Sequence, residues 1–468
     1  MAYKLHFISL GCAKNMVNCE QMMALCRDAG MELCPSPEGC DAAVVNTCGF
    51  LSSANEEAIE NILAMAELKK AGKLKKILVT GCMTQRYQGE VAKELPEVDG
   101  ILGTGSYKGI VDAVETVMAG GTVSRFDDIN APVDEFGRVL TTPGHYAFLR
   151  IAEGCDNWCA FCIIPKLRGK YRSRTMEHVL AEARQLADSG VKELIVIAQD
   201  ITRYGMDWDG KPHLADLLEE LCKLDFHWIR LHYLYPEWID DRLIDVIARE
   251  DKILKYLDIP LQHCNDKILK KMNRRGDKKY LCALLDKLRE RIPGLVLRTS
   301  IIAGLPGDTV AGFEHSLRQA IALDPENITV HTLTLKRASR IVIEDQKEND
   351  YADVAAMLEK CHLLAEAGYR PYYLYRQKNT LQNLENVGWC KPGHEGYYNI
   401  YIMEEVQTIL SAGAGGSTKL VADGGKRMQR IFNFKYPNEY IQRFAEVLER
   451  KKGVADFYDH DLGPETSS

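Results

Sequence analysis

Three cysteines within eight residues are the part of this sequence with the clearest chemistry. Cys155, Cys159 and Cys162 form a C-x3-C-x2-C motif directly after a strand-like stretch. Such a loop can wrap one iron–sulfur cluster, and three ligands on a four-iron cluster leave one iron open to a small molecule. An open iron suits S-adenosylmethionine, which chelates through its amino and carboxylate groups. The motif therefore predicts a [4Fe-4S] cluster that binds S-adenosylmethionine.

Two other interpretations of this motif are weaker. A structural zinc site needs four ligands, and no fourth cysteine or histidine lies nearby at the usual spacing. Three core cysteines brought together by chance would be expected on a helix face rather than on a loop. A disulfide framework is not expected for the 15 cysteines of this 468-residue chain, because cytosolic thiols are kept reduced.

A second set of cysteines follows three strand-like runs near the N-terminus. Cys12, Cys48 and Cys82 each stand in a loop directly after such a run. Loops at the carboxyl ends of parallel strands face a common crevice, so these thiols could hold a second cluster. Spacing alone leaves that assignment open. The neighbouring cysteines are expected to be core or surface thiols instead: Cys19, Cys26, Cys34 and Cys40.

The fold class that must position these residues is α/β. Strand-like runs at residues 4–9, 42–46 and 76–80 alternate with helical patterns at 17–29, 52–70 and 85–95, which predicts a parallel N-terminal domain over residues 1–124. Residues 125–144 are rich in Asp, Pro and Gly and are expected to be a linker.

A second alternation of strands and helices follows over residues 145–350. It predicts a partial (βα)6 barrel with its chemistry at the carboxyl ends of the strands. Residues 351–468 are expected to form a mixed C-terminal extension, in which only a helix over residues 351–367 is clear. The six strands of the barrel are expected at 146–152, 193–198, 229–231, 256–259, 295–303 and 327–332.

Composition adds expectations about partners and location. The formal charge is −7 and 46% of the residues are hydrophobic, so no domain-wide basic field points to nucleic acid. No apolar run approaches the roughly 18 residues that cross a bilayer, and residues 5–10 are too short for a signal peptide. We therefore expect a cytoplasmic protein without membrane or strong nucleic-acid binding.

The first cysteine motif resembles the signature of the radical S-adenosylmethionine enzymes, in which an aromatic residue, here Phe161, precedes the last cysteine. The resemblance implies reductive cleavage of the sulfonium to a 5′-deoxyadenosyl radical, which abstracts hydrogen from an unactivated carbon. It also implies an electron donor such as flavodoxin or ferredoxin.

The N-terminal cysteines and several later motifs resemble the methylthiotransferases over about residues 1–308. The forms of these motifs are similar to the RimO-type branch, which modifies an aspartate β-carbon of small-subunit ribosomal protein twelve. The resemblance implies two [4Fe-4S] clusters, one S-adenosylmethionine as methyl donor and another as radical source. The family usually has Asp-Ser-Glu at Asn18-Cys19-Glu20, a departure expected to lie away from the ligands. The later motifs are Ile164-Pro165, Arg168-Gly169, Arg172-Ser173-Arg174, Gln199-Asp200, Tyr204-Gly205, Tyr233 to Pro236 and Pro260 to His263.

Residues near the predicted strand ends are candidates for holding the cofactor. Gln199 and Asp200 end the second strand of the barrel, where the methionine part of the cofactor would lie, although Asp200 could simply cap the next turn. Phe161 and Gln262 complete the predicted cofactor-binding set. His263 could orient substrate or be a structural histidine.

Two further features near the site have two interpretations each. The turn from Gly304 to Gly307 could admit the nucleoside or be only a turn. The basic stretch after the cluster could neutralise a carboxylate, guide an acidic partner, or form a solvated face. That stretch consists of Lys166, Arg168, Lys170, Arg172 and Arg174.

After residue 308 the resemblance changes. Residues 309–468 look like the C-terminal part of a HemZ-type oxygen-independent coproporphyrinogen dehydrogenase, another radical enzyme, and no TRAM-type domain is recognisable. The alternatives are therefore coproporphyrinogen oxidation, or a hybrid chain that cleaves S-adenosylmethionine without turning over a substrate. Lys336, Arg337, Arg340 and the aromatics of residues 369–375 would suit a carboxylate-rich tetrapyrrole or form an ordinary basic surface.

Overall fold

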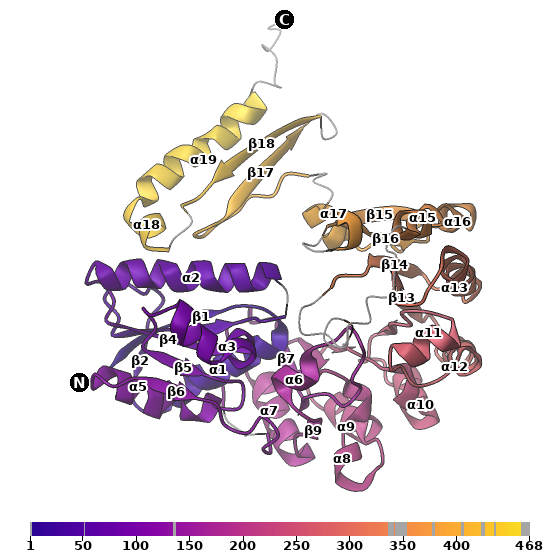
Figure 1. The fold of residues 1–468 in the computed structure, drawn as a ribbon, viewed down its shortest axis with the longest axis horizontal. Coiled ribbons are helices and arrows are strands. Elements are labelled where there is room, and N and C mark those ends of the chain that lie inside the picture. The colour runs from indigo at the N-terminus through magenta and orange to yellow at the C-terminus, as the bar shows by residue number, and fades with distance from the viewer. Residues whose placement is uncertain are drawn as a thin grey trace, which may run out of the picture.

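The computed structural model describes residues 2–50, 52–133, 137–335, 341, 353–376, 380–403, 407–422, 426–434 and 437–459. Figure 1 shows an N-terminal α/β unit beside a barrel-like unit, with a C-terminal hairpin and two helices lying above α2. Lys336, Arg337 and Arg340 lie outside the described residues. In the part of the chain that is described, none of the helices has both the length and the apolar character needed to span a bilayer.

The N-terminal unit is a six-stranded parallel sheet of order β2-β1-β3-β4-β5-β6. Its central strands are apolar runs buried under helices on both faces, as parallel sheets require. Helices α1 and α5 pack on one face and α2 on the other. The strands are β1 (Lys4–Ser9), β2 (Glu32–Leu33), β3 (Ala42–Thr47), β4 (Lys76–Gly81), β5 (Gly100–Leu102) and β6 (Val123–Arg125), and the helices are α1 (Ala13–Asp28), α2 (Ser52–Lys70), α3 (Cys82–Tyr87), α4 (Gly89–Glu94) and α5 (Ile110–Met118).

Two helices of this unit differ from the sequence-based prediction. Helix α1 begins at Ala13, directly after Cys12, rather than at residue 17. The helix expected over 85–95 is wrong as a single element, because α3 ends at Tyr87 and α4 begins at Gly89. Gln88 between them has φ 39°, a left-handed value that interrupts a helix.

The barrel contains the six predicted parallel strands in two ladders. Strands β7, β10 and β11 form one ladder and β12, β13 and β14 the other, and the bridge from Ile229 to Ile253 joins them. The predicted α/β fold with a partial six-stranded barrel is confirmed. The strands are β7 (Tyr146–Arg150), β10 (Glu193–Ile197), β11 (Trp228–Leu231), β12 (Tyr256–Asp258), β13 (Val296–Ala303) and β14 (Asn327–Thr332).

Helices follow the barrel strands and cover their outer side, and a short ribbon stands beside the first strand. The ribbon pairs β8 (Ala152–Glu153) with β9 (Arg172–Ser173), so the first predicted strand ends early, at Arg150. The helices are α6 (Ile164–Arg168), α7 (Met176–Asp188), α8 (Met206–Asp209), α9 (Leu214–Cys222), α10 (Asp241–Arg249), α11 (Asp266–Lys271), α12 (Lys278–Arg291) and α13 (Val310–Ala322).

The C-terminal extension adds two structures that the sequence did not reveal. Strands β16 (Asn386–Cys390) and β15 (Arg370–Tyr375) continue the barrel sheet in antiparallel fashion beyond β14. A separate hairpin of β17 (Ser417–Ala422) and β18 (Arg427–Phe432) packs against α19 (Phe444–Asp459). The expected helix over 351–367 is two short helices where it is described. The remaining helices are α15 (Val354–Glu359), α16 (His362–Glu366), α17 (Tyr397–Met403) and α18 (Pro437–Gln442).

Helix α1 joins the two units. Val17 on this helix packs against Ile195 and Ile197 of β10. Arg138, from the stretch expected to be a linker, is buried and pairs with Glu20 of α1 at 3.6 Å and with Glu182 of α7 at 3.1 Å. The carboxyl ends of the N-terminal strands are thereby held against the start of the barrel.

Candidate active site

The loop that carries Cys155, Cys159 and Cys162 lies between β8 and α6. Cys155 and Cys159 are buried and Cys162 is half-buried. Gly154 precedes the loop with φ 84°, and a Cβ there would stand 1.9 Å from the Lys170 carbonyl oxygen, so only glycine fits. Burial, helped by the charges of Asp200 and of the other two thiols, raises the pKa of the Cys155 thiol to about 12. The structure therefore places the three predicted thiols near one another in a single loop.

The surroundings of these thiols suit an anionic cluster. Among the described residues, no three Cys, His, Asp or Glu side chains converge closely enough to hold a single metal ion. The Tyr235 hydroxyl lies 2.8 Å from Cys159 Sγ, and the Ile164 amide donates to Cys162 Sγ at 3.4 Å. The buried Arg274 guanidinium stacks 4.2 Å from the Tyr235 ring centroid. Hydrogen-bond donors and a cation near the ligand sulfurs stabilise the negative charge of an iron–sulfur cluster, so these residues fit one.

Asp200 holds the cysteine loop from the next strand. Its buried carboxylate accepts hydrogen bonds from Asn157 Nδ2 at 3.0 Å and from the Thr202 amide and hydroxyl at 3.1 and 2.5 Å. Burial raises its pKa to about 6. Asp200 therefore caps the short 3-10 helix Ile201–Arg203 and also fixes the loop through Asn157. Its predicted role in cofactor binding stays a prediction.

Two glutamines of the predicted cofactor-binding set carry unpaired acceptors. Gln199 donates through Nε2 to Glu153 Oε1 at 2.6 Å. The buried Oε1 atoms of Gln199 and Gln262 find no hydrogen-bond partner within the described structure. A buried acceptor without a partner is costly, and a ligand's amino group would satisfy it. Phe161, the remaining predicted cofactor residue, packs against the barrel core.

Cys12, Cys48 and Cys82 stand at the carboxyl ends of the adjacent strands β1, β3 and β4. The loops touch: a Cβ on Gly11 would lie 2.7 Å from Cys48 Cβ, and one on Gly49 would lie 2.6 Å from the Cys82 carbonyl oxygen. Burial raises the pKa of Cys48, and the other two thiols raise it further. The structure therefore places the thiols of this second predicted set near one another as well. Three thiols are donors that also fit an iron–sulfur cluster.

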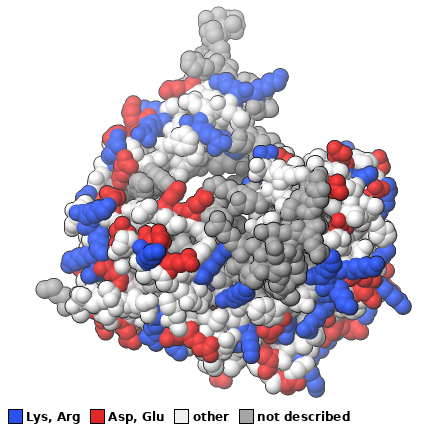
Figure 2. Space-filling view, in the orientation of Figure 1, with Lys and Arg blue, Asp and Glu red and all other residues white. Residues whose placement is uncertain are grey.

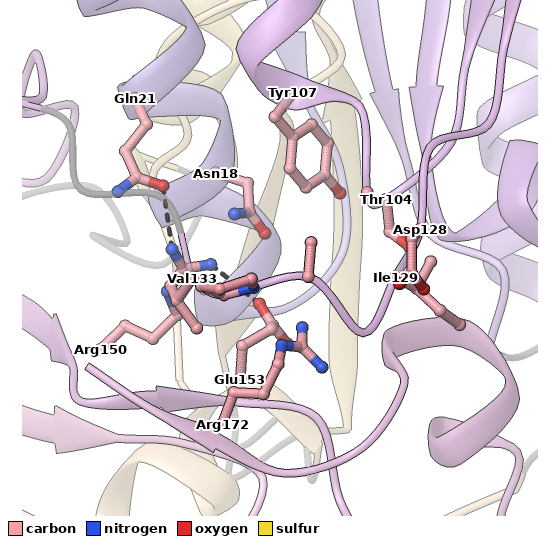
Figure 3. A pocket seen from close by; sticks show the side chains of 13 residues that line it. Asn18, Gln21, Thr104, Tyr107, Asp128, Ile129, Val133, Arg150, Glu153 and Arg172 are labelled. Atoms are coloured by element: carbon pink, nitrogen blue, oxygen red, sulfur yellow. Dashed lines mark hydrogen bonds and ion pairs between the residues drawn. The ribbon is translucent and has the colours of Figure 1, made fainter.

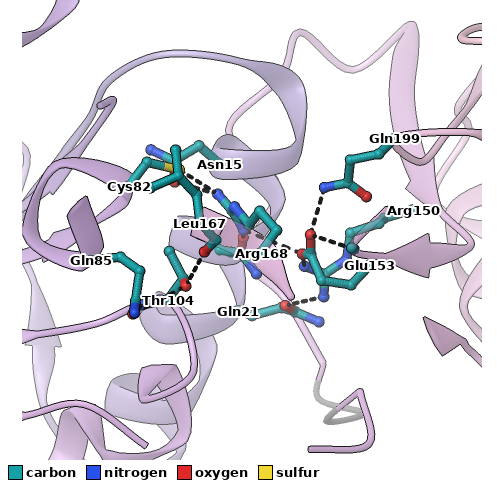
Figure 4. A network of polar contacts seen from close by, with 12 residues as sticks. Asn15, Gln21, Cys82, Gln85, Thr104, Arg150, Glu153, Leu167, Arg168 and Gln199 are labelled. Carbon is teal, nitrogen blue, oxygen red and sulfur yellow. Dashed lines mark hydrogen bonds and ion pairs between the residues drawn. The ribbon is translucent and has the colours of Figure 1, made fainter. Parts of the chain in front are cut away.

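Arg168, which the sequence placed in a basic stretch of uncertain role, is buried between Glu153 of the barrel and Cys82 of the N-terminal unit (Figure 4). Its guanidinium donates to Cys82 Sγ at 3.2 Å and to Asn15 Oδ1 at 3.0 Å. It also donates to Asn18 Oδ1 at 2.7 Å and to Glu153 Oε2 at 3.2 Å. The expectation that Asn18 lies away from the ligands is therefore wrong, since one guanidinium separates it from Cys82.

Glu153 is the carboxylate at the centre of this network, and sequence reasoning missed it. It accepts from Arg150 at 2.8 Å as well as from Arg168 and Gln199. Burial raises its pKa, but the charges of Arg168 and Arg150 prevail and hold it at about 2. Its position two residues before Cys155 was the available signal.

The other charged or polar candidates are spread over several environments. Lys166 and Lys170 are exposed, whereas Arg174 is buried and pairs with Glu182 at 2.6 Å. The fully buried His263 lies 3.0 Å from Asp308, as a structural histidine would.

The remaining described features that the sequence singled out lie in a turn, in a strand and in the core. Gly304 and Gly307 have φ 87° and 79° in the turn after β13. Tyr373 and Tyr375 stack on each other in β15. Burial raises the pKa of Cys19, Cys26 and Cys40 to about 12.

A small polar cavity of about 50 Å³ lies between the two units beside Glu153 (Figure 3). Asn18 and Gln21 of α1 line one side, and Arg150 and Arg172 line the other. The Tyr107 hydroxyl and the Nε atoms of both arginines are buried there, and no described residue pairs with them. Such a cavity has room for the ordered water that would satisfy these donors.

Comparison with known proteins follows the same division of the chain. Residues 4–103 match the model of "Uncharacterized protein family UPF0004", and residues 149–320 match that of the radical SAM superfamily. The chain is 51% identical over 308 residues to "Ribosomal protein uS12 methylthiotransferase RimO" of Lachnoclostridium phytofermentans, covering 65% of this chain and 70% of that protein. The Myxococcus xanthus protein of the same name is 49% identical over 66% of this chain and 65% of its own length.

Solved structures show the fold alone. The chain is similar to the radical S-adenosylmethionine methyltransferase TsrM of Kitasatospora setae, with a TM-score of 0.57 and 14% identity over 96% of this chain and 89% of that one.

Proposed function

Because the chain belongs to the RimO family of radical S-adenosylmethionine methylthiotransferases, we propose that it adds a methylthio group to the β-carbon of an aspartate in small-subunit ribosomal protein uS12. The observation that carries the proposal is the pair of three-thiol sets, one on each unit, joined by the Arg168–Glu153 contact. Replacing C–H by C–S–CH3 needs a radical at carbon and a sulfur within reach, so the reaction needs two centres at one boundary.

The radical centre is assigned to Cys155, Cys159 and Cys162. When bound, clusters at the two cysteine sets would supply the electron that cleaves S-adenosylmethionine and an open iron for sulfur. Burial of Cys155 and Cys159 keeps water from this part of the radical centre, and Asp200 keeps the loop in place through Asn157. Cys12, Cys48 and Cys82 are assigned to the second [4Fe-4S] cluster.

Binding of S-adenosylmethionine is assigned to Phe161, Gln199, Asp200 and Gln262. The unpaired Oε1 atoms of the two glutamines would accept hydrogen bonds from the amino group of the methionine part. Gln199 is held in place by its own bond to Glu153. The proposed partners are ribosomal protein uS12 or its ribosomal subunit, and an electron donor of the flavodoxin or ferredoxin class.

Two triple variants test the assignment of the centres. Reconstituted full-length chain should hold about eight irons, since each cluster has four. Cys12, Cys48 and Cys82 replaced together by Ala should leave about four irons and retain 5′-deoxyadenosine formation, while methylthio transfer is lost. The same replacement of Cys155, Cys159 and Cys162 should leave about four irons and abolish 5′-deoxyadenosine formation.

The two variants serve as each other's control, because both remove three thiols. Residual 5′-deoxyadenosine in the second variant would contradict the radical-site assignment. About eight irons in the variant of Cys12, Cys48 and Cys82 would contradict the assignment of the N-terminal cluster, and with it the proposed methylthio transfer.

A further inference from the structure

Arg168 belongs to the barrel, yet it contacts a cysteine of the N-terminal sheet (Figure 4). We propose that Arg168 is a positioning residue that raises the reduction potential of the cluster on Cys12, Cys48 and Cys82 by donating to Cys82 Sγ. The inference rests on the second cluster of the proposed function and adds a residue that sets its electron affinity.

The contact between Arg168 and Cys82 is held in place by the other partners of Arg168. The Arg168 side chain is only 3% exposed, and both terminal nitrogens are engaged: one on Cys82 and Asn15, the other on Asn18 and Glu153. Four acceptors in fixed directions leave the planar guanidinium little freedom. Its second nitrogen is therefore aimed at the sulfur by the other three contacts.

The charges around this cation do not balance. Arg168 and Arg150 share one carboxylate, that of Glu153, and the acceptors on α1 are the neutral amides of Asn15 and Asn18. The described contacts thus leave an excess positive charge, and it faces Cys82. In a buried site a charge is weakly screened, and hydrogen bonds and charge near the ligand sulfurs set the potential of an iron–sulfur cluster.

The sign follows from the charge of the cluster. Adding an electron makes the cluster more negative, so a nearby cation and an N–H donor on a ligand sulfur stabilise the reduced state more than the oxidised state. Removing or neutralising Arg168 should therefore lower the potential. Because Arg168 ends α6 and Glu153 lies two residues before Cys155, the barrel itself supplies this effect.

The test is an anaerobic redox titration of the N-terminal cluster followed by electron paramagnetic resonance. The full-length chain with Cys155, Cys159 and Cys162 replaced by Ala is the parent, so that only the N-terminal cluster reports. In this parent, Arg168→Gln should lower the electron affinity of the cluster at least tenfold, which is 59 mV for one electron. Asn18→Asp keeps Arg168 but pairs it with a second carboxylate, and should also lower the affinity at least tenfold.

Gln21→Glu is the matched control. It adds the same charge to the same helix, but Gln21 accepts from Arg150 at 3.0 Å rather than from Arg168. It should change the electron affinity less than threefold. A potential unchanged in Asn18→Asp would overturn the inference, even if Arg168→Gln fails to fold.

An equal shift of the potential in Asn18→Asp and Gln21→Glu would also overturn the inference. It would show that any added negative charge on α1 lowers the potential, without the Arg168–Cys82 contact. A parent that binds no cluster would instead overturn the proposed function, and the inference with it.

Discussion

Replacing Glu153 by Gln should destabilise the metal-free chain by about 3 kcal/mol at pH 7. Burial raises the pKa of this carboxyl, but Arg168 and Arg150 hold it at about 2, against 4.5 for an unperturbed glutamate. That difference corresponds to about 3 kcal/mol of stabilisation. Glutamine keeps the shape but leaves two buried guanidinium groups without their shared carboxylate, a loss that typically costs about 3–5 kcal/mol.

The pH dependence gives the sign of the effect. A carboxyl with a lowered pKa in the folded state stabilises fully above its unfolded pKa, so the full difference should be present above pH 4.5. Between pH 4.5 and pH 2 it should shrink by about 1.4 kcal/mol for each pH unit. Urea unfolding of wild type and variant at pH 7, 5 and 3.5 measures both features.

The control for this experiment is an exposed glutamate with an ion pair of its own. Glu67 pairs with Lys70 at 2.8 Å on the surface, and Glu67→Gln should change the free energy of unfolding by less than about 0.5 kcal/mol. The reasoning is refuted if Glu153→Gln behaves like this control, or if its destabilisation persists unchanged at pH 3.5.

Three other substitutions, the last with a surface control, probe the cysteine loop and the boundary between the two units. Relative to Asp200→Asn, the wild type should lose stability as the pH rises from about 4 to 6, because burial raises the pKa of Asp200 to about 6. A free energy of unfolding in urea that changes equally with pH in both proteins would contradict this. Gly154→Ala should reduce 5′-deoxyadenosine formation at least tenfold, because the new Cβ meets the Lys170 carbonyl oxygen at 1.9 Å. Unchanged iron content and turnover would contradict this, because they would show that the loop tolerates the added methyl group. Ile197→Ala should cost about 3 kcal/mol in urea unfolding, whereas Leu410→Ala, 66% exposed, should stay within about 0.5 kcal/mol; equal losses would mean that the α1 contact does not stabilise the chain.

The central strands were predictable because their apolar runs are long and buried. Residues 4–9 and 76–80 coincide with β1 and β4 to within one residue. The short strands β2, β5 and β6 were missed because two or three residues carry no readable periodicity. The antiparallel β15 and β16 were missed because their pairing depends on β14, far away in the sequence.

The cysteines of the candidate site were predictable, but the groups around them were not. Cysteines that follow directly after predicted strands can be recognised from residue type and position alone. Arg168 was ambiguous because arginine is almost always exposed, and the packing of the N-terminal unit on the barrel buries it. Asn18 was placed wrongly for the same reason, since its neighbour across the boundary is 150 residues away in the chain.

The central claim is tested most directly by the product on ribosomal protein uS12. The reconstituted chain would be incubated with small ribosomal subunits, sulfide, reductant and S-adenosylmethionine labelled in its methyl group, and the protein analysed by tandem mass spectrometry. The account predicts a gain of CH2S on one aspartate, with the labelled methyl in the product, and none with the Cys12, Cys48 and Cys82 variant. Unmodified uS12 despite 5′-deoxyadenosine formation, or oxidative decarboxylation of coproporphyrinogen offered in its place, would contradict it.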